Sequence, residues 1–486
     1  MKSLEDSKAA LVFKYFQKTS DIPRGSGNEK EISNYLADFA KKLGLQVIQD
    51  KALNIIIKKP ATKGYEGAPT VIIQGHMDMV CEKNIGTEHD FEKDPLKLEV
   101  KGDKIYAKGT TLGADDGIAV AYGMALLADD KIEHPSLEVL ITTDEEAGMT
   151  GAMEVSKDDI KGKILINLDT EEEGFLLVSC AGGIRTSSSI KVELESIGKE
   201  EIFHIEVRGL KGGHSGSDIH RGRGNANKLL GRVLKDILEN MNLNLVSISG
   251  GSKNNAIPRE ADAFITVGEK EREKLFKIVK NFDEIFKNEL QGQDPGVTLS
   301  IKEDKGVFKD KFTKKCTEKV ISLLYLYPNG VNTMSANIDG LTESSTNLGV
   351  LGIKNNEVEF DSAVRSSVPS LNEDIVLRIK GITEIIGGNF ATNAGYPSWE
   401  YKKDSKIREL CIDVYKKNYG KTPQVYAIHA GVECGLFEKT LGRLDMISFG
   451  PDIMDAHTPG ENLSISSTER VWEYLLEVLK NIDNNY

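Results

Sequence analysis

The sequence predicts an α/β fold: a split domain with a mixed, mostly parallel sheet and helices on both faces, interrupted by an inserted α+β domain. Three observations lead to this prediction. Up to Cys180, short apolar runs alternate with stretches of helical spacing, which is a βαβ pattern. After Cys180, apolar and polar residues alternate as in half-exposed antiparallel strands. From about residue 404 the first pattern returns.

The elements of the first part follow from the spacing of apolar residues. Ile32, Leu36 and Leu43 recur at helical intervals within residues 28–44, which end in Gly44, a helix stop signal. Short apolar runs predict strands that are buried on both faces, and one helix lies between two of them. The strands are expected at 45–50, 54–60, 70–75, 137–142 and 162–169, and the helix at 115–130.

The middle and last parts are read in the same way. Residues 184–194 and 202–209 predict strands, and residues 224–240 and 269–289 predict long helices. The last part predicts strands at 424–428 and 444–450 and a terminal helix from Ser467. The expected domains are therefore residues 1–183 and 396–486 for the split α/β domain, and residues 184–395 for the inserted domain.

Composition and charge narrow the class of protein. The formal net charge of −13 argues against a nucleic-acid partner, which needs a basic face. No apolar run approaches the ~20 residues of a membrane helix, so no membrane partner is expected, and residues 1–16 indicate an amphipathic helix and not a signal peptide. The five cysteines are scattered and form no CxxC motif, which is typical of a reducing compartment. We therefore expect a cytoplasmic location.

Polar residues that follow apolar strands are candidates for a functional site, because ligands of open α/β sheets bind beyond the carboxyl ends of the strands. Four predicted strands end in such residues, and one predicted helix begins with two acids. The segments are His76-Met77-Asp78, Asp144-Glu145-Glu146, Asp169 with the acids at 171–173, Asp452 with His457, and Asp115-Asp116.

Each segment has a structural interpretation when it is taken alone. A single histidine at a strand end is more often structural, the acids of residues 113–117 can cap a helix, and a run of acids is usually solvated. Together they place two histidines and several carboxylates at one sheet edge. Imidazole and carboxylate ligands without thiolates suit zinc, manganese or cobalt in a hydrolytic site. Such cations would offset the repulsion between the acids.

Six segments in order resemble the co-catalytic di-zinc aminopeptidase and dipeptidase family: GHMDMV, TLGADDGIAVA, TTDEEAGMTGA, NLDTEEEG, GLKGGHSG and DAHTPGE. Within it, the chain is most similar to the aminoacyl-histidine dipeptidases, a carnosinase-like group also called peptidase D or cytosolic non-specific dipeptidases. The segments span residues 75–461, so the resemblance covers nearly the whole chain. It implies a metallopeptidase in which the split domain is catalytic and the inserted domain is a lid.

Carried over segment by segment, the resemblance implies two divalent metal ions, zinc foremost, with manganese or cobalt as alternatives. The implied ligands are His76 for one metal, His457 for the other, Asp115 between both, and Glu146 and Asp169 for one metal each. Asp78 would orient and polarise His76, and Glu145 would be the general base. The Asp115–Asp116 peptide bond is expected to be cis.

The two neighbouring glutamates are expected to do different work. If their backbone is extended, Glu146 faces a metal and Glu145 faces the substrate, because adjacent side chains of an extended chain point to opposite sides. The expected reaction is hydrolysis of small unblocked dipeptides, Xaa-His among them, by a hydroxide that bridges the metals, with Glu145 as proton shuttle. The alternatives are an N-acyl amino acid deacylase or carboxypeptidase of the same superfamily, and a non-catalytic binding protein.

Residues outside the metal set are implied to bind the substrate. His214 would donate to the oxyanion, Asn255 is a further candidate, and Arg365 suits the terminal carboxylate of a dipeptide. Gly431 would line the pocket, and Glu433 would lie near the substrate's amino group. The expected partner is thus a small dipeptide substrate, and a homodimer is left open.

Overall fold

The structure is a computed structural model that describes residues 4–304, 306 and 308–486. The chain folds into two compact units. Unit 1 consists of Met1–Ser179, Tyr401–Ala427 and Val432–Tyr486, and unit 2 consists of Cys180–Glu400 and Ile428–Gly431. The sequence places the domain boundaries at 183/184 and 395/396, and these boundaries remain predictions.

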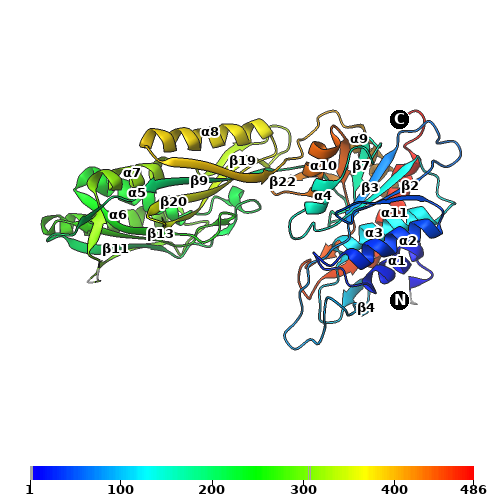
Figure 1. The fold of residues 1–486 in the computed structure, drawn as a ribbon, viewed down its shortest axis with the longest axis horizontal. Helices are drawn as coiled ribbons and strands as arrows, with labels where there is room; N and C mark the ends of the chain where they lie inside the picture. The colour runs from blue at the N-terminus through cyan, green and yellow to red at the C-terminus, as the bar shows by residue number, and fades with distance from the viewer. Residues whose placement is uncertain (1–3, 305, 307) are drawn as a thin grey trace. The chain divides into compact units, whose positions relative to one another are not determined.

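Unit 1 is built on an eight-stranded mixed sheet (Figure 1). Across the sheet the order is β1 (Gln46–Gln49), β2 (Ile55–Lys59), β6 (Leu137–Thr142), β3 (Val71–His76), β7 (Ile164–Asn167), β23 (Asp445–Ser448), β8 (Phe175–Cys180) and β22 (Gln424–Ile428). The inner strands β6, β3, β7 and β23 are parallel. The pairs β1–β2, β2–β6 and β23–β8 are antiparallel. The three strands predicted at 70–75, 137–142 and 162–169 therefore form the parallel centre of the sheet.

The inner strands are buried on both faces, as their apolar runs predict. In β3, Ile72 and Ile73 point to opposite faces, and they are 0% and 1% exposed. Helix α3 (Ala114–Ala128) packs against β3 and is buried along residues 114–127. The ammonium group of Lys59 donates to the carbonyl oxygens of Leu126 and Asp129, at 3.0 Å each, and so closes the C-terminal end of α3.

The helices of unit 1 come from both ends of the chain. They are α1 (Ala10–Ser20), α2 (Lys30–Lys42), α3, α4 (Thr150–Glu154), α9 (Lys406–Tyr419), α10 (Glu433–Leu441) and α11 (Ile465–Lys480). Figure 1 shows the blue N-terminal helices and the red helix α11 in the same unit. Helix α11 begins at Ile465 and not at the predicted Ser467, because Ser464 caps it by accepting the N–H of Ser467.

A smaller sheet positions a loop that matters for the site. Its strands are β24 (Ile453–Met454), β25 (Asn462–Ser464), β5 (Lys104–Ala107) and β4 (Leu98–Lys101). Strands β24 and β25 pair antiparallel, with Met454 opposite Asn462, so residues 455–461 form the loop of a hairpin. Strand β25 pairs in turn with β5, which fixes the hairpin to the body of unit 1.

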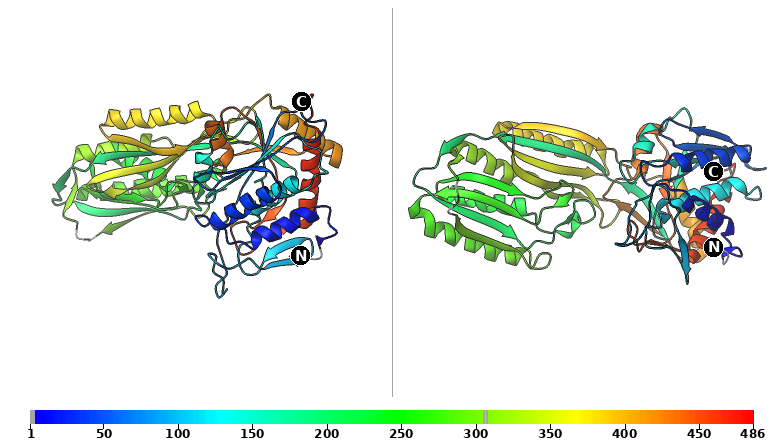
Figure 2. Two further views of the ribbon diagram at one scale, coloured as in Figure 1. Left: turned by 45° about the vertical axis from the view of Figure 1, so that its right-hand side comes forward. Right: turned by 60° about the horizontal axis from the view of Figure 1, so that its bottom comes forward.

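The described part of unit 2 contains a nine-stranded sheet, and long helices cover it (Figure 2). The sheet order is β16 (Thr298–Asp304), β11 (Glu201–Arg208), β15 (Ala261–Val267), β13 (Leu243–Gly250), β19 (Thr342–Lys354), β20 (Glu357–Ser366), β9 (Gly182–Lys191) and β21 (Asn389–Tyr396), and β18 (Gly330–Met334) pairs with β19. The helices are α5 (Ala226–Asn240), α6 (Arg272–Glu289), α7 (Lys314–Leu326) and α8 (Pro369–Ile386). The helices predicted at 224–240 and 269–289 are confirmed as α5 and α6.

The sheet of unit 2 has one apolar face. Phe203, Ile205 and Val207 alternate along β11 and belong to the core that the helices cover, whereas Ile202 and Glu206 are only partly buried. This alternation agrees with the half-exposed antiparallel strands that the sequence predicts after Cys180. None of the helices in the described part of the chain is both long and apolar enough to cross a membrane.

Candidate metal centre

The polar residues predicted at strand ends converge at one edge of the unit 1 sheet. Strand β3 ends at His76, the segment after β6 carries Glu145 and Glu146, and the segment after β7 carries Asp169. Because β6, β3 and β7 are parallel neighbours, their carboxyl ends meet at this edge. The first turn of α3 adds Asp115. The structure therefore brings together residues that lie in separate parts of the sequence.

A glycine lets α3 approach β3 beside His76. A Cβ atom at Gly75 would lie 2.4 Å from the Cβ of Ala119 and 2.5 Å from a carboxylate oxygen of Asp116, which is too close for any side chain. The GHMDMV segment thus needs its glycine for the approach of the helix that carries Asp115 and Asp116.

The carboxylate of Asp115 lies between two histidines. Its Oδ1 atom is 3.1 Å from Nε2 of His76, and its Oδ2 atom is 3.1 Å from Nε2 of His457. Each histidine has a further carboxylate: Asp169 Oδ1 is 3.4 Å from Nε2 of His76, and Glu146 Oε1 is 3.1 Å from Nε2 of His457. Two groups of one histidine and one carboxylate therefore share Asp115.

The spacing within each group suits a metal ion. Two ligand atoms about 2.1 Å from a tetrahedral metal lie about 3.4 Å from each other, and the separations above are 3.1–3.4 Å. The ligand atoms of Asp115, Glu146 and His457 all lie within 4.8 Å of one another, and those of His76 and Asp169 do so as well. These residues can therefore hold divalent metal ions.

The charges at the site also favour cations. Hydrogen bonds to Asp115 and Glu146 raise the pKa of His457 to about 11. Burial raises the pKa of Asp169 well above its ordinary range, and attraction to His76 offsets this only in part. Both shifts favour bound protons on these two side chains. Because metal ligation needs neutral imidazole and ionised carboxylate, bound cations would displace these protons.

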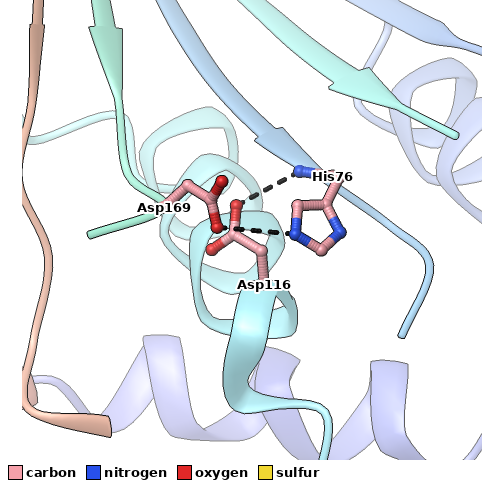
Figure 3. A group of neighbouring side chains, drawn as sticks. All are labelled: His76, Asp116 and Asp169. Atoms are coloured by element: carbon pink, nitrogen blue, oxygen red, sulfur yellow. Dashed lines mark hydrogen bonds and ion pairs between the residues drawn. The ribbon is translucent and has the colours of Figure 1, made fainter. Parts of the chain in front are cut away.

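Asp116 also lies in this group, although the sequence analysis assigns it no ligand role. Figure 3 shows Asp116 beside His76 and Asp169. Its Oδ2 atom accepts the backbone N–H of His76 at 3.1 Å, and burial, followed by repulsion from Asp169, raises its pKa well above the ordinary range. The Asp115–Asp116 peptide bond is cis, as expected. Asp116 thus anchors the end of β3 and adds a carboxylate next to the ligands.

Asp78 lies where it can orient both His76 and the segment of the two glutamates. One of its oxygens is 3.4 Å from Nδ1 of His76. The carboxylate also accepts the hydroxyl of Ser26 at 2.8 Å and the backbone N–H groups of Glu145 and Glu146 at 3.0 and 3.2 Å. These bonds hold Asp78 as an ionised acceptor, which suits a residue that fixes the tautomer of a ligating histidine.

The prediction that Glu145 and Glu146 alternate on an extended backbone is wrong. Both lie in a turn that follows Asp144, a residue with a φ of 56°. The N–H groups of Gly148 and Met149 donate to the carbonyl oxygen of Asp144 and close this turn. The sequence analysis assigns no function to Asp144, and the structure shows that this residue shapes the turn that carries the two glutamates.

The turn still gives the two glutamates different surroundings. Glu146 contacts His457, as described above, whereas Oε2 of Glu145 lies 4.0 Å from Nε2 of His76. Burial raises the pKa of Glu145 to about 7, although the charge of His76 lowers it. A carboxylate with a pKa near 7 can both accept and release a proton at neutral pH.

Two buried charged residues at this site were missed from the sequence. Glu461 accepts backbone N–H groups of residues 112–115, and Arg24 donates to the carbonyl oxygens of Met77, Asp78 and Gly113. Glu461 can be recognised from the sequence, because it is the last residue of the DAHTPGE segment. No motif or periodicity marks Arg24.

Glu433, at the start of α10, lies in a buried polar network next to the ligands. It is 1% exposed, and its Oε2 atom accepts the side-chain N–H of Gln74 at 2.6 Å and the hydroxyl of Thr142 at 2.9 Å. The side-chain amide of Asn167 donates to Oε1 of Gln74 at 2.6 Å. Burial, followed by repulsion from Glu145, raises the pKa of Glu433 to about 8. Its second oxygen has no hydrogen-bond partner in the described structure.

Within unit 2, three of the predicted substrate residues lie near one another. Arg365 is 8% exposed; its Nε atom donates to the hydroxyl of Ser215 at 3.3 Å, and its Nη1 atom donates to the hydroxyl of Tyr396. Gly431 faces the same tyrosine, since a Cβ atom there would lie 2.5 Å from the ring. Arg365 is also close enough to His214 to lower the pKa of its imidazole.

The ring of His214 is held in one tautomer. Its Nδ1 atom accepts the backbone N–H groups of Gly216 and Ser217, at 3.3 Å each, so the proton of the neutral ring belongs on Nε2. Burial, followed by the charge of Arg365, lowers the pKa of His214. At neutral pH the residue is therefore a neutral hydrogen-bond donor through Nε2.

Asn255 lies directly before the strand that pairs with the strand of His214. Strand β12 (Gly213–His214) pairs with β14 (Ala256–Ile257), and the carbonyl oxygen of Asn255 accepts the N–H of Ser215 at 2.8 Å. The side chain of Asn255 is exposed. Its backbone thus supports the β12–β14 pair, and its side chain faces solvent.

A further cluster in unit 2 is a weaker candidate for a metal site. His204, Glu206 and Asp262 place possible ligand atoms within 4.8 Å of one another. Arg208 lies 2.6 Å from Asp262, and Lys302 lies 2.9 Å from Glu206. These cations already balance the carboxylates, so the cluster is an ion-pair network on the sheet.

Comparison with known proteins gives the family. Residues 72–481 match the model of peptidase family M20/M25/M40. The chain belongs to this family. A cytosol non-specific dipeptidase from Escherichia coli strain K12 is 39% identical over 486 residues, which cover 99% of each protein. The resemblance drawn from the six sequence segments is thereby confirmed.

Solved structures of family members share the fold. The crystal structure of an aminoacylhistidine dipeptidase from Vibrio alginolyticus is 37% identical and covers 98% of each chain with a TM-score of 0.95. An aminopeptidase from Bacillus cereus, 15% identical over 98% of each chain, has a TM-score of 0.55 and shares the fold alone. The fold predicted from the sequence, a split α/β domain with an inserted domain, is thus shared with solved members of this peptidase family.

Proposed function

We propose that this chain is a metal-dependent peptidase that hydrolyses small unblocked dipeptides, with Xaa-His dipeptides among its substrates. The observation that carries the proposal is the Asp115 carboxylate, whose two oxygens lie against His76 and His457. A shared carboxylate of this kind suits two divalent ions about 3.5–4 Å apart. The names of the Escherichia coli and Vibrio alginolyticus relatives, a non-specific dipeptidase and an aminoacylhistidine dipeptidase, support the substrate class.

Five side chains would hold the ions: His76, Asp115 and Asp169 one ion, and His457, Asp115 and Glu146 the other. Two divalent ions at such a site acidify water and polarise a carbonyl group. Zinc is the first candidate, and manganese and cobalt are the alternatives, because sites of histidine and carboxylate accept several metals. Asp78 would fix the ring of His76 through its contact with Nδ1.

Glu145 would be the general base. It stands 4.0 Å from Nε2 of His76, farther than Asp115 at 3.1 Å and Asp169 at 3.4 Å. Burial brings its pKa to about 7, which lets it take a proton from the attacking water and pass it to the leaving amine. The backbone N–H of Glu145 donates to Asp78, so the base and the first histidine are oriented by the same carboxylate.

Glu433 would bind the free amino group of the dipeptide. Its buried carboxylate has one oxygen without a partner in the described structure and lies in the same unit as the ligands. Burial raises the pKa of Glu433 to about 8, and an ammonium group beside it would lower that pKa again. Substrate binding would thus ionise Glu433, which favours substrates with an unblocked amino end.

Four residues of unit 2 are proposed to bind the substrate. Arg365 would bind the terminal carboxylate, because a guanidinium group can make two parallel hydrogen bonds to it. His214 would donate to the oxyanion through its Nε2–H. Asn255 and Gly431 are proposed as further lining residues.

The test is a substrate panel on protein stripped of metal and reloaded. Chelator-treated protein should be inactive, and zinc, manganese or cobalt should restore hydrolysis of free dipeptides. N-acetyl amino acids should remain uncleaved; if they are the better substrates, the chain is a deacylase. Activity that persists with metal shown to be absent contradicts the mechanism, and metal binding without any hydrolysis would indicate a binding protein.

We further infer a cytoplasmic location, and the assembled state stays open between a monomer and a homodimer. The location is supported by the Escherichia coli relative, which is named a cytosol enzyme. The assembled state is checked by light scattering of the purified protein, where a mass of one chain contradicts the dimer.

A further inference from the structure

Two buried residues of opposite charge bind the same short segment, residues 112–115, which ends in Asp115. The carboxylate of Glu461 accepts the N–H groups of Leu112 at 2.7 Å, Gly113 at 2.9 Å, Ala114 at 2.7 Å and Asp115 at 3.3 Å. The guanidinium of Arg24 donates through Nη2 to the carbonyl oxygen of Gly113. Glu461 thus accepts hydrogen bonds from the N–H groups of the segment, and Arg24 donates one to a carbonyl oxygen of the segment.

Both residues are 2% exposed, so their charges are removed from water. Buried charges are costly unless hydrogen bonds satisfy them, and apolar residues of similar size often stabilise a fold as well or better. The chain also makes room for Arg24, because a Cβ atom at Gly113 or Gly117 would lie 2.6 or 2.4 Å from its Nη2 atom. This arrangement indicates a role in placing the segment and not in stability alone.

Each residue connects the 112–115 segment to a part of the chain that carries one histidine. Arg24 also donates through Nη1 to the carbonyl oxygens of Met77, at 2.9 Å, and Asp78, at 3.1 Å, directly after His76. Glu461 lies in the hairpin loop 455–461, which carries His457. The Arg24–Glu461 pair therefore fixes the backbone of Asp115 relative to both histidines that its carboxylate contacts.

We propose that Arg24 and Glu461 are positioning residues that set the Asp115 carboxylate between its two histidines, so that both metal ions bind as a pair. This inference rests on the metal centre of the proposed function. Positioning residues and ligands should differ in what their loss does. Loss of a histidine removes the one ion that it holds. Loss of Glu461 or Arg24 weakens the binding of both ions together, because both ions depend on Asp115.

The experiment measures zinc binding to Glu461→Gln in chelator-buffered zinc, without any peptide substrate. The amide keeps the size of the side chain but turns an N–H₂ group toward backbone N–H groups. We expect both equivalents of zinc to bind at least tenfold more weakly and to be lost in parallel. The visible spectrum of the cobalt-loaded variant, which reports coordination geometry, should also change.

Glu138→Gln is the matched control. Glu138 is a buried carboxylate of unit 1 that accepts the backbone N–H groups of Lys161 and Gly162, outside the group around Asp115. This variant should bind two zinc ions with wild-type affinity and give the wild-type cobalt spectrum. An equal loss of zinc in Glu138→Gln would mean that any lost buried carboxylate weakens the centre, which overturns the proposal.

Wild-type affinity for two zinc ions in Glu461→Gln also overturns it, and so does the loss of one ion alone. If Glu461→Gln does not fold by circular dichroism, Arg24→Lys replaces it, since lysine keeps the charge but cannot reach all three carbonyl oxygens; the same outcomes decide. A wild-type protein that binds no pair of ions contradicts the proposed metal centre itself. Two bound ions without dipeptide hydrolysis contradicts only the proposed substrate.

Discussion

Nε2 of His457 lies 3.1 Å from Oδ2 of Asp115, although 342 residues separate the two in the chain. The contact is made by the loop between β24 and β25, which returns to the edge where β3, β6 and β7 end. Asp115 meets His76 through its other oxygen. His457 is therefore the residue whose removal tests whether one carboxylate serves two ions.

His457→Ala should halve the metal content. His76, Asp115 and Asp169 keep one group of ligands, so one ion per chain should remain while dipeptide hydrolysis falls to background. Metal is counted by plasma mass spectrometry after dialysis. His220→Ala, which removes an exposed histidine of unit 2, should keep two ions. Two ions in His457→Ala would show that this histidine is not a ligand.

Glu145→Gln should lower kcat for dipeptides by about 10²–10⁴-fold, the usual contribution of a general acid–base group. Its metal content should stay at the wild-type value, because Glu145 lies farther from His76 than Asp115 and Asp169 do. Steady-state kinetics and metal analysis of the same sample check both points. Glu172→Gln, at an exposed position near the same sheet edge, should have wild-type kcat. A wild-type rate for Glu145→Gln would refute the base assignment.

Glu433→Gln should weaken the recognition of free amino ends. A hydrogen bond to a charged group contributes about 1.5–3 kcal/mol, so kcat/KM for unblocked dipeptides should fall roughly 10- to 100-fold. The comparison is made with the same dipeptides carrying an acetylated amino end, for which the variant and the wild type should give equal values. If the two proteins do not differ on free dipeptides either, Glu433 does not bind the amino group.

His429 should make unit 2 less stable in acid. It is 7% exposed, and its Nε2 atom lies 2.7 Å from the hydroxyl of Ser345. Burial, followed by the charge of Arg365, lowers its pKa to about 3, whereas an unfolded histidine has a pKa of about 6.5. Between these values the unfolded chain binds a proton that the native chain does not, so stability is lost as pH falls through this window.

The measurement is urea unfolding of wild type and His429→Gln at pH 7 and pH 5. The wild type should lose about 2 kcal/mol more of its unfolding free energy than the variant over this range. Equal losses in wild type and His429→Gln would mean that His429 is protonated in the folded protein.

The part of the site that the sequence predicts is the part carried by strand ends. Three apolar runs end in His76, the glutamate turn and Asp169, and the rule that parallel strands present their carboxyl ends at one edge is sufficient to group them. The helix with Asp115 follows from the same reasoning, because acids in a first helical turn are recognisable in sequence.

The rest depends on contacts and backbone angles that spacing does not encode. Glu461 binds N–H groups that lie 346–349 residues earlier, and Arg24 is a single basic residue in a segment without a motif. The turn of Glu145 and Glu146 depends on the positive φ of Asp144, which only the structure reveals. The conformation of Asp144 thus explains why the side chains of Glu145 and Glu146 do not follow the alternation of an extended chain.

The position of the hairpin loop between β24 and β25 has a consequence for protein synthesis. A ribosome makes Asp115 342 residues before it makes His457, and all of Cys180–Glu400 is translated in between. A chain whose translation stops within that stretch carries His76 and Asp169 but lacks the second histidine. The proposed hydrolytic centre therefore stays incomplete until residues 455–461 have been made, and products that end before them should lack peptidase activity.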